Sequence, residues 1–184
     1  MFLEDLLQYE KLTLYQLSNL AHVPYSTLAD IKSGKAKIQN CSVKVAKSIA
    51  DVFGLTINEL LDYAEPFEVF RCNTLHSLKY AGEEALLYKI LSSRLIDYYY
   101  RIHCHSKCLY LLALVDYLCE KCGIERITNY EPLRKLKLAS PLISSDLQFL
   151  KKRLSEEQFS ELMEAAMPEF MKYNIVEDDL YNVV

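Results

Sequence analysis

The sequence predicts an all-α fold made of two helical domains. Four glycines and five prolines among 184 residues leave little room for the many tight turns of an all-β protein. Apolar residues recur at helical spacing along most of the chain, which is long enough for two modest cores. We expect a five-helix domain over residues 1–63, a linker over 64–72 that contains Pro66, and a second helical domain over 73–184.

The first two helices are predicted by an apolar stripe and a capping motif. The stripe of the first helix consists of Leu3, Leu6 and Leu7. Thr13 and Gln16 have the spacing of a capping box, in which each side chain accepts a hydrogen bond from a backbone amide at the start of a helix. The second helix is therefore expected to begin just after Thr13.

Proline, glycine and a second capping box delimit the next three helices. Pro24 suits the start of the third helix, because its missing N–H would have no partner there. Gly34 ends that helix, and Gly54 ends the fourth, since glycine readily adopts the left-handed conformation. Thr56 and Glu59 form a capping box that opens the fifth helix.

The third helix, within VPYSTLADIKSG at residues 23–34, has one apolar and one small, polar face. The polar face consists of Tyr25, Ser26, Ala29, Asp30 and Ser33. A major groove admits such a helix, and short polar side chains near its N-terminus reach base edges.

The stretch LTLYQLSNLAHVPYSTLADIKSGKAKI, residues 12–38, closely resembles the helix-turn-helix of the lambda-repressor-like Xre/Cro family. Leu17-Ser18 stands where that family has Leu-Ala, and His22-Val23-Pro24 stands where it has Gly-Val-Ser. The resemblance implies sequence-specific binding of double-stranded operator DNA by a homodimer. It also implies base-edge contacts from Tyr25, Ser26 and Asp30 and a phosphate contact near Thr27.

Two residues depart from the family pattern. Leu14 replaces a glutamine that often touches phosphate, and His22 replaces the turn glycine. Residues 31–50 hold five lysines and no Asp or Glu, so they supply a local positive field in a chain of net charge −4. We expect Lys32, Lys35 and Lys37 to meet phosphates; the alternative is a solvated lysine face on a domain retained for protein contacts.

Helices of the second domain are expected near 74–81, 83–101, 107–122, 145–154 and 156–172. The helix at 107–122 is apolar nearly all round and should lie at the centre of the second core. Its longest apolar run, CLYLLALV, is too short for a membrane span, and the N-terminus lacks a signal-peptide pattern. We therefore expect a cytoplasmic protein with no membrane contact.

HCHSKC at 103–108 and CEKC at 119–122 bring four cysteines and two histidines into a short segment. Thiolate and imidazole are the ligands of tetrahedral zinc. Cys108 and Cys119 also lie in the apolar helix, where a free cysteine packs as a small hydrophobe. We favour packing, with no metal and no cofactor, and leave zinc as the alternative.

The C-terminal tail combines apolar residues with an acidic run and is unlike the frayed, polar end of most domains. We expect it to dock, either on its own domain or on another protein whose basic cleft meets the acidic run. The predicted docking residues are Tyr173, Ile175, Val176, Glu177, Asp178, Leu180 and Tyr181.

The sequence shows no nucleophile–base pair, glycine-rich phosphate loop or paired acid motif, so we do not expect an enzyme. The function predicted is that of a transcriptional repressor or autoregulator. Its second domain more weakly resembles the helical extension of small Xre-type regulators encoded beside toxin-like partners, which implies an antitoxin whose second domain binds the toxin. The alternative is a stand-alone regulator whose second domain senses a small ligand or a metal.

Overall fold

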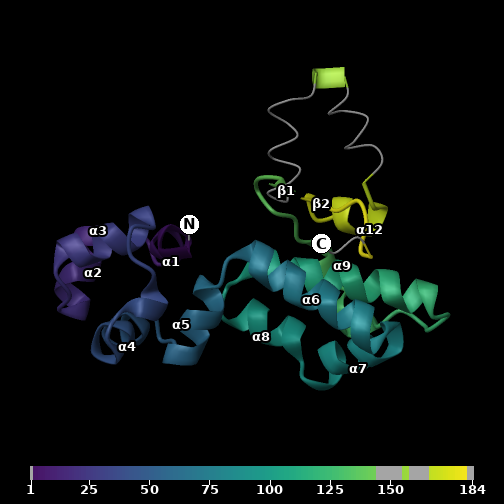
Figure 1. The fold of residues 1–184 in the computed structure, drawn as a ribbon, viewed down its shortest axis with the longest axis horizontal. Coiled ribbons are helices and arrows are strands. Elements are labelled where there is room, and N and C mark those ends of the chain that lie inside the picture. The colour runs from purple at the N-terminus through teal and green to yellow at the C-terminus, as the bar shows by residue number, and fades with distance from the viewer. Residues whose placement is uncertain (1, 144–154, 158–165, 182–184) are drawn as a thin grey trace. The chain divides into compact units, whose positions relative to one another are not determined.

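The computed structural model describes residues 2–143, 155–157 and 166–181, and the chain divides into two compact units, Met1–Glu65 and Pro66–Val184. Helices dominate both units in Figure 1, which confirms the all-α prediction. A single two-stranded parallel pairing is the sheet found among the described residues.

Five α-helices and one 3-10 turn make up the described part of the first unit, as predicted. They are α1 (Phe2–Tyr9), α2 (Leu14–Ala21), α3 (Tyr25–Ser33), η1 (Ile38–Asn40), α4 (Val43–Val52) and α5 (Ile57–Ala64). Both predicted capping boxes are present, at Thr13 with Gln16 and at Thr56 with Glu59. The fully buried core side chains include Leu3, Leu17, Leu28, Ile49 and Leu60.

The second unit begins with α6 (Phe67–Ala81), where the sequence pattern predicted a linker over 64–72. That prediction is wrong from Phe67 onward, because Pro66 starts a helix here instead of interrupting one. The first turns of α6 are stabilised by ring contacts, with the centroids of Phe67 and Phe70 lying 5.3 and 6.0 Å from that of Tyr110.

Helix α9 (His105–Lys121) is the centre of the second unit, as its apolar sequence predicted. Helices α7 (Glu83–Ser92) and α8 (Leu95–Arg101) pack against it. The sequence predicted one helix over 83–101, but Arg94 takes a left-handed conformation with φ of 51° and separates the two.

After two short turns, η2 (Thr128–Tyr130) and η3 (Leu133–Lys135), strand β1 (Leu142–Ile143) pairs in parallel with β2 (Ile175–Val176). Figure 1 shows β2 and α12 (Pro168–Met171) beside β1 and over α9. The helix predicted over 145–154 lies outside the described residues. Residues 158–165 of the helix predicted over 156–172 also lie outside the described residues, and Pro168 begins the short helix α12.

The carboxylate of Asp116 on α9 holds the segment after that helix in place. Nε and Nη2 of Arg134 donate to its two oxygens at 2.7 to 3.2 Å, and Nη2 of Arg126 donates at 2.7 Å. The hydroxyl of Tyr173 donates to the same carboxylate at 3.5 Å. Burial raises the pKa of Asp116, but the hydrogen bonds and charges of the two arginines outweigh it, so the pKa lies below its ordinary value.

We predict that Asp116→Asn lowers the free energy of unfolding at pH 7 by about 3 kcal/mol, because two arginines lose their buried counter-charge. A carboxyl with a depressed folded-state pKa stabilises the protein above its unfolded pKa of about 3.9, and that stability is lost as pH falls through the folded value. Urea unfolding followed by circular dichroism should therefore show the difference between variant and wild type shrinking from pH 6 to pH 3. A constant difference would contradict this account.

Candidate nucleic-acid interface

Helix α3 presents one clear face to solvent and one to the core. It begins after Pro24 and ends at Gly34, which takes the left-handed conformation with φ of 78°. Leu28 and Ile31 are buried against the other helices of the unit. The predicted base-edge residues Tyr25, Ser26 and Asp30 are exposed, and Thr27 is half-buried. The exposed face is thus free of large core side chains and lies at the start of a helix, as a groove-reading element requires.

The turn before α3 is formed without glycine. His22 adopts φ of 53° and ψ of 38°, the left-handed region in which most side chains are strained. Ser18 braces this turn: its backbone oxygen accepts from the amides of His22 and Val23, and its hydroxyl donates to the carbonyl of Val23 at 2.7 Å. Where the family pattern has alanine, this serine therefore fixes the angle at which α3 leaves the turn.

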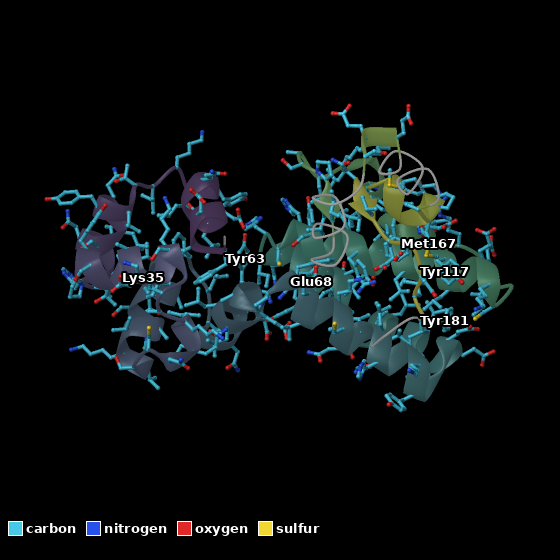
Figure 2. The ribbon with its side chains drawn as sticks, turned by 45° about the horizontal axis from the view of Figure 1, so that its top comes forward. Lys35, Tyr63, Glu68, Tyr117, Met167 and Tyr181 are labelled. Atoms are coloured by element: carbon cyan, nitrogen blue, oxygen red, sulfur yellow. The ribbon has the colours of Figure 1, made fainter. Side chains whose placement is uncertain are left out.

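The five lysines of residues 31–50 are not equivalent in the folded unit. Nζ of Lys32 lies 3.3 Å from a carboxylate oxygen of Glu4 on α1, and Lys47 pairs with Asp51 at 2.8 Å. Lys35, labelled in Figure 2, and Lys37 are exposed in the segment after α3. The predicted positive field is therefore weakened at Lys32 and Lys47 by their carboxylate partners, and it is retained at Lys35 and Lys37 after the end of α3.

The cysteine and histidine cluster is dispersed in the second unit. Cys104, Cys108 and Cys119 are buried, and Cys122 is half-buried. Burial raises the pKa of the Cys108 thiol to about 12, so it stays protonated near neutral pH, whereas zinc binds the thiolate. Within the described ranges, no three His, Cys, Asp or Glu side chains gather as metal ligands.

The C-terminal tail docks on its own unit, the first of the two alternatives. The buried members of the predicted docking set are Tyr173, Ile175, Val176, Glu177 and Leu180. Of the predicted set, only Asp178 and Tyr181 remain accessible, Tyr181 with 40% of its surface exposed. Binding of another protein by this set stays a prediction; in the structure, these two residues are the members that a partner could reach while the tail is docked.

Sequence reasoning missed the partners that hold the tail. Arg71 and Tyr110 bind the carboxylate of Glu177, yet Arg71 lies in the predicted linker and Tyr110 in an apolar run. The signal in the sequence was Arg71 itself, a basic residue within an otherwise apolar helical stripe, which indicates that a counter-charge lies nearby in the fold. Its counter-charge lies 106 residues away, so spacing alone did not reveal it.

An open hollow on the second unit lies between α6 and α7. Its lining includes His76, Tyr80, Leu86 and Lys89. Tyr80 and the nearby Tyr88 are 80% and 74% exposed, which is unusual for aromatic side chains.

Residues 3–66 match the family model of the Cro/C1-type HTH DNA-binding domain. This span coincides with the first unit apart from one residue or two at each end. No curated protein and no solved structure matches the chain. No helix in the part of the chain that the structure describes is long and apolar enough to cross a membrane.

We predict that Ser18→Ala lowers the stability of the first unit by about 1 kcal/mol, because the Val23 carbonyl loses its part-buried donor. Hydrogen exchange of peptides covering residues 14–34, measured in the full chain, should show correspondingly faster opening. Ser33→Ala is the matched control, since that hydroxyl donates to the Asp30 carbonyl at 3.2 Å on an exposed surface where water replaces it. Equal effects of the two substitutions would mean that Ser18 does not brace the turn.

Proposed function

Because the first unit is a Cro/C1-type helix-turn-helix DNA-binding domain, we propose that this DNA-binding transcriptional regulator is a repressor that controls its own promoter. The exposed face of α3 carries the proposal. Tyr25, Ser26 and Asp30 project from the side opposite Leu28 and Ile31, so α3 enters a major groove without uncovering the core. The tyrosine and serine hydroxyls donate or accept at base edges, and the Asp30 carboxylate accepts from a cytosine amine.

Phosphate contacts in this proposal come mainly from the segment that follows α3. Lys35 and Lys37 are exposed there, Thr27 lies on α3 itself, and Lys32 contributes less because Glu4 neutralises it. The overall charge of −4 does not oppose binding, since screening limits the reach of distant charges to about 10 Å. One such domain binds weakly, so we propose a homodimer on two half-sites about one helical turn apart.

In our proposal the second unit binds a protein partner. We favour the interpretation that the chain is an antitoxin and that this partner is a toxin encoded beside it. The buried side chains of the first unit lie mainly on its helices α1 to α5 and its turn η1, and its residues form a compact unit separate from Pro66–Val184. The second unit has a separate core around α9 and exposes Tyr80, which lines the hollow between α6 and α7, and also Tyr88 on α7. Exposed aromatic side chains next to an apolar hollow are typical of protein interfaces.

We predict that Tyr25→Ala with Ser26→Ala weakens binding to the chain's own promoter at least about tenfold, because each base contact contributes about 1–3 kcal/mol. Both side chains are exposed, so circular dichroism of the variant should be unchanged. Fluorescence anisotropy with a labelled promoter fragment measures the affinity. Tyr80→Ala, which removes an exposed tyrosine from the second unit, is the control and should bind as the wild type does. Unchanged affinity of the double variant would refute the assignment of α3.

For the antitoxin role, we predict that the product of the adjoining gene arrests growth when expressed alone and that co-expression of this chain relieves the arrest. The two proteins should co-purify at a fixed ratio. The Tyr25→Ala, Ser26→Ala variant should neutralise equally well, because its changes lie in the first unit. A neighbouring product that neither arrests growth nor binds would remove the antitoxin reading and leave the DNA-binding proposal untouched.

A further inference from the structure

The C-terminal tail, residues 166–181, is held to the second unit in the way that a bound peptide is held. Strand β2 adds to β1, and the amide of Leu142 donates to the carbonyl of Asn174 at 2.9 Å. The amide of Leu138 donates to the carbonyl of Tyr173 at 3.1 Å, and the side chain of Asn174 donates back to the carbonyl of Leu138 at 3.1 Å. This main-chain pattern is strand addition, a recurrent mode of peptide recognition.

A buried clamp grips Glu177, whose carboxylate is buried while those of Asp178 and Asp179 beside it are exposed. Nε of Arg71 donates to Oε2 of Glu177 at 2.7 Å, and Nη2 of the same guanidinium donates to Oε1. The hydroxyl of Tyr110 donates to Oε2 at 3.0 Å. The side chain of Glu177 is 1% exposed and that of Arg71 is 13% exposed. Burial lowers the pKa of Arg71, but the hydrogen bond and charge of Glu177 outweigh this and raise it, so the guanidinium stays charged.

Apolar side chains anchor the tail on both sides of this carboxylate. The anchors are Phe170, Tyr173, Ile175, Val176 and Leu180, each no more than 3% exposed. The ring of Phe170 lies 5.1 Å from that of Tyr110, and Val176 packs with Ala166, Ile143 and Met171. Pockets for side chains around a gripped carboxylate define a sequence preference as well as an affinity.

The far end of the tail is fastened at the surface. The hydroxyl of Tyr181 donates to Glu83 at 2.6 Å and accepts from Nζ of Lys121 at 2.7 Å. Nζ of Lys121 also lies 4.3 Å from the centre of the Tyr181 ring. Figure 2 labels Tyr181 at this end of the tail, with Met167 at the other end and Tyr117 of α9. These exposed contacts contribute little stability, so release of the tail can start here.

We propose that the surface formed by Arg71, Tyr110 and residues 138–143, which the tail contacts, is a peptide-binding site. The chain's own tail covers it as an internal ligand, and a partner protein covers it with a segment of like chemistry. That segment presents a carboxylate directly after two aliphatic residues, as Ile175-Val176-Glu177 does, in an extended conformation that pairs with β1.

The choice of an acidic partner segment follows from the energetics of the clamp. A buried ion pair stabilises a fold no better than well-packed apolar residues of similar volume, but a buried guanidinium without its carboxylate is strongly unfavourable. The clamp therefore discriminates: it accepts a carboxylate and rejects neutral or basic segments. The proposal concerns the second unit alone and does not depend on DNA binding by the first.

A tethered tail competes with any partner at an effective concentration on the order of millimolar. The test uses a fluorescent synthetic peptide of residues 166–181 and anisotropy titrations with the full chain. Wild-type chain should bind it weakly, whereas Glu177→Ala, whose own tail has lost the carboxylate, should bind it at least about tenfold tighter. No gain in the Glu177→Ala chain would overturn the proposal.

Matched variants separate recognition of the carboxylate from loosening of the fold. A peptide with glutamine in place of Glu177 should bind the Glu177→Ala chain at least about tenfold more weakly than the parent peptide. In that chain, Tyr110→Phe removes only the donating hydroxyl and should cost severalfold in affinity, while Arg71→Ala should abolish binding. Equal binding of the two peptides would refute the clamp.

If light scattering shows a wild-type dimer that both Glu177→Ala and Arg71→Ala dissociate, the occupant is the tail of a second copy, and the assignment to a foreign segment is wrong.

Discussion

The burial of α9 is the constraint on which the second unit depends. A helix that is apolar nearly all round must be covered on every side, and α7, α8 and α12 pack against it. The polar groups on α9 are then removed from water and need compensation. Lys107 lies 5.3 and 5.7 Å from the ring centres of Phe70 and Tyr99, Asp116 is held by two arginines, and Tyr110 donates to Glu177. The tail and the segment after α9 are positioned by these compensating contacts.

The first unit is organised differently, because its stability is local. Helices α2 to α5 are each begun or ended by a neighbouring capping residue, namely Thr13, Gly34, Ser42 and Thr56. Its buried side chains lie mainly on α1 to α5 and the turn η1. This local construction keeps the exposed face of α3 free for a ligand, and the brace at Ser18 and His22 sets the direction of that face. Substitutions should therefore alter the DNA binding of the first unit and the proposed partner binding of the second unit separately.

Much of this could be predicted from sequence where the determining residues are close together. The five helices of the first unit, both capping boxes and the central position of α9 were all predicted correctly. The helical start at Phe67 and the break at Arg94 were not. Pro66 is compatible with a linker or with a helix start, and only the packing of Phe67 and Phe70 on Tyr110 decided between them.

The sequence by itself determined the five helices of the first unit, which face of α3 is polar and which helix must be buried. These properties depend on neighbours within about four positions, whose spacing is fixed by the geometry of a helix. Only the tertiary structure decided which charged residues pair. Glu4 lies beside Lys32 and reduces its positive field, and Glu177 binds Arg71 and Tyr110, which are far from it in the sequence. A buried charge can be satisfied by any counter-charge that the fold brings near, so its partner is not encoded in local spacing.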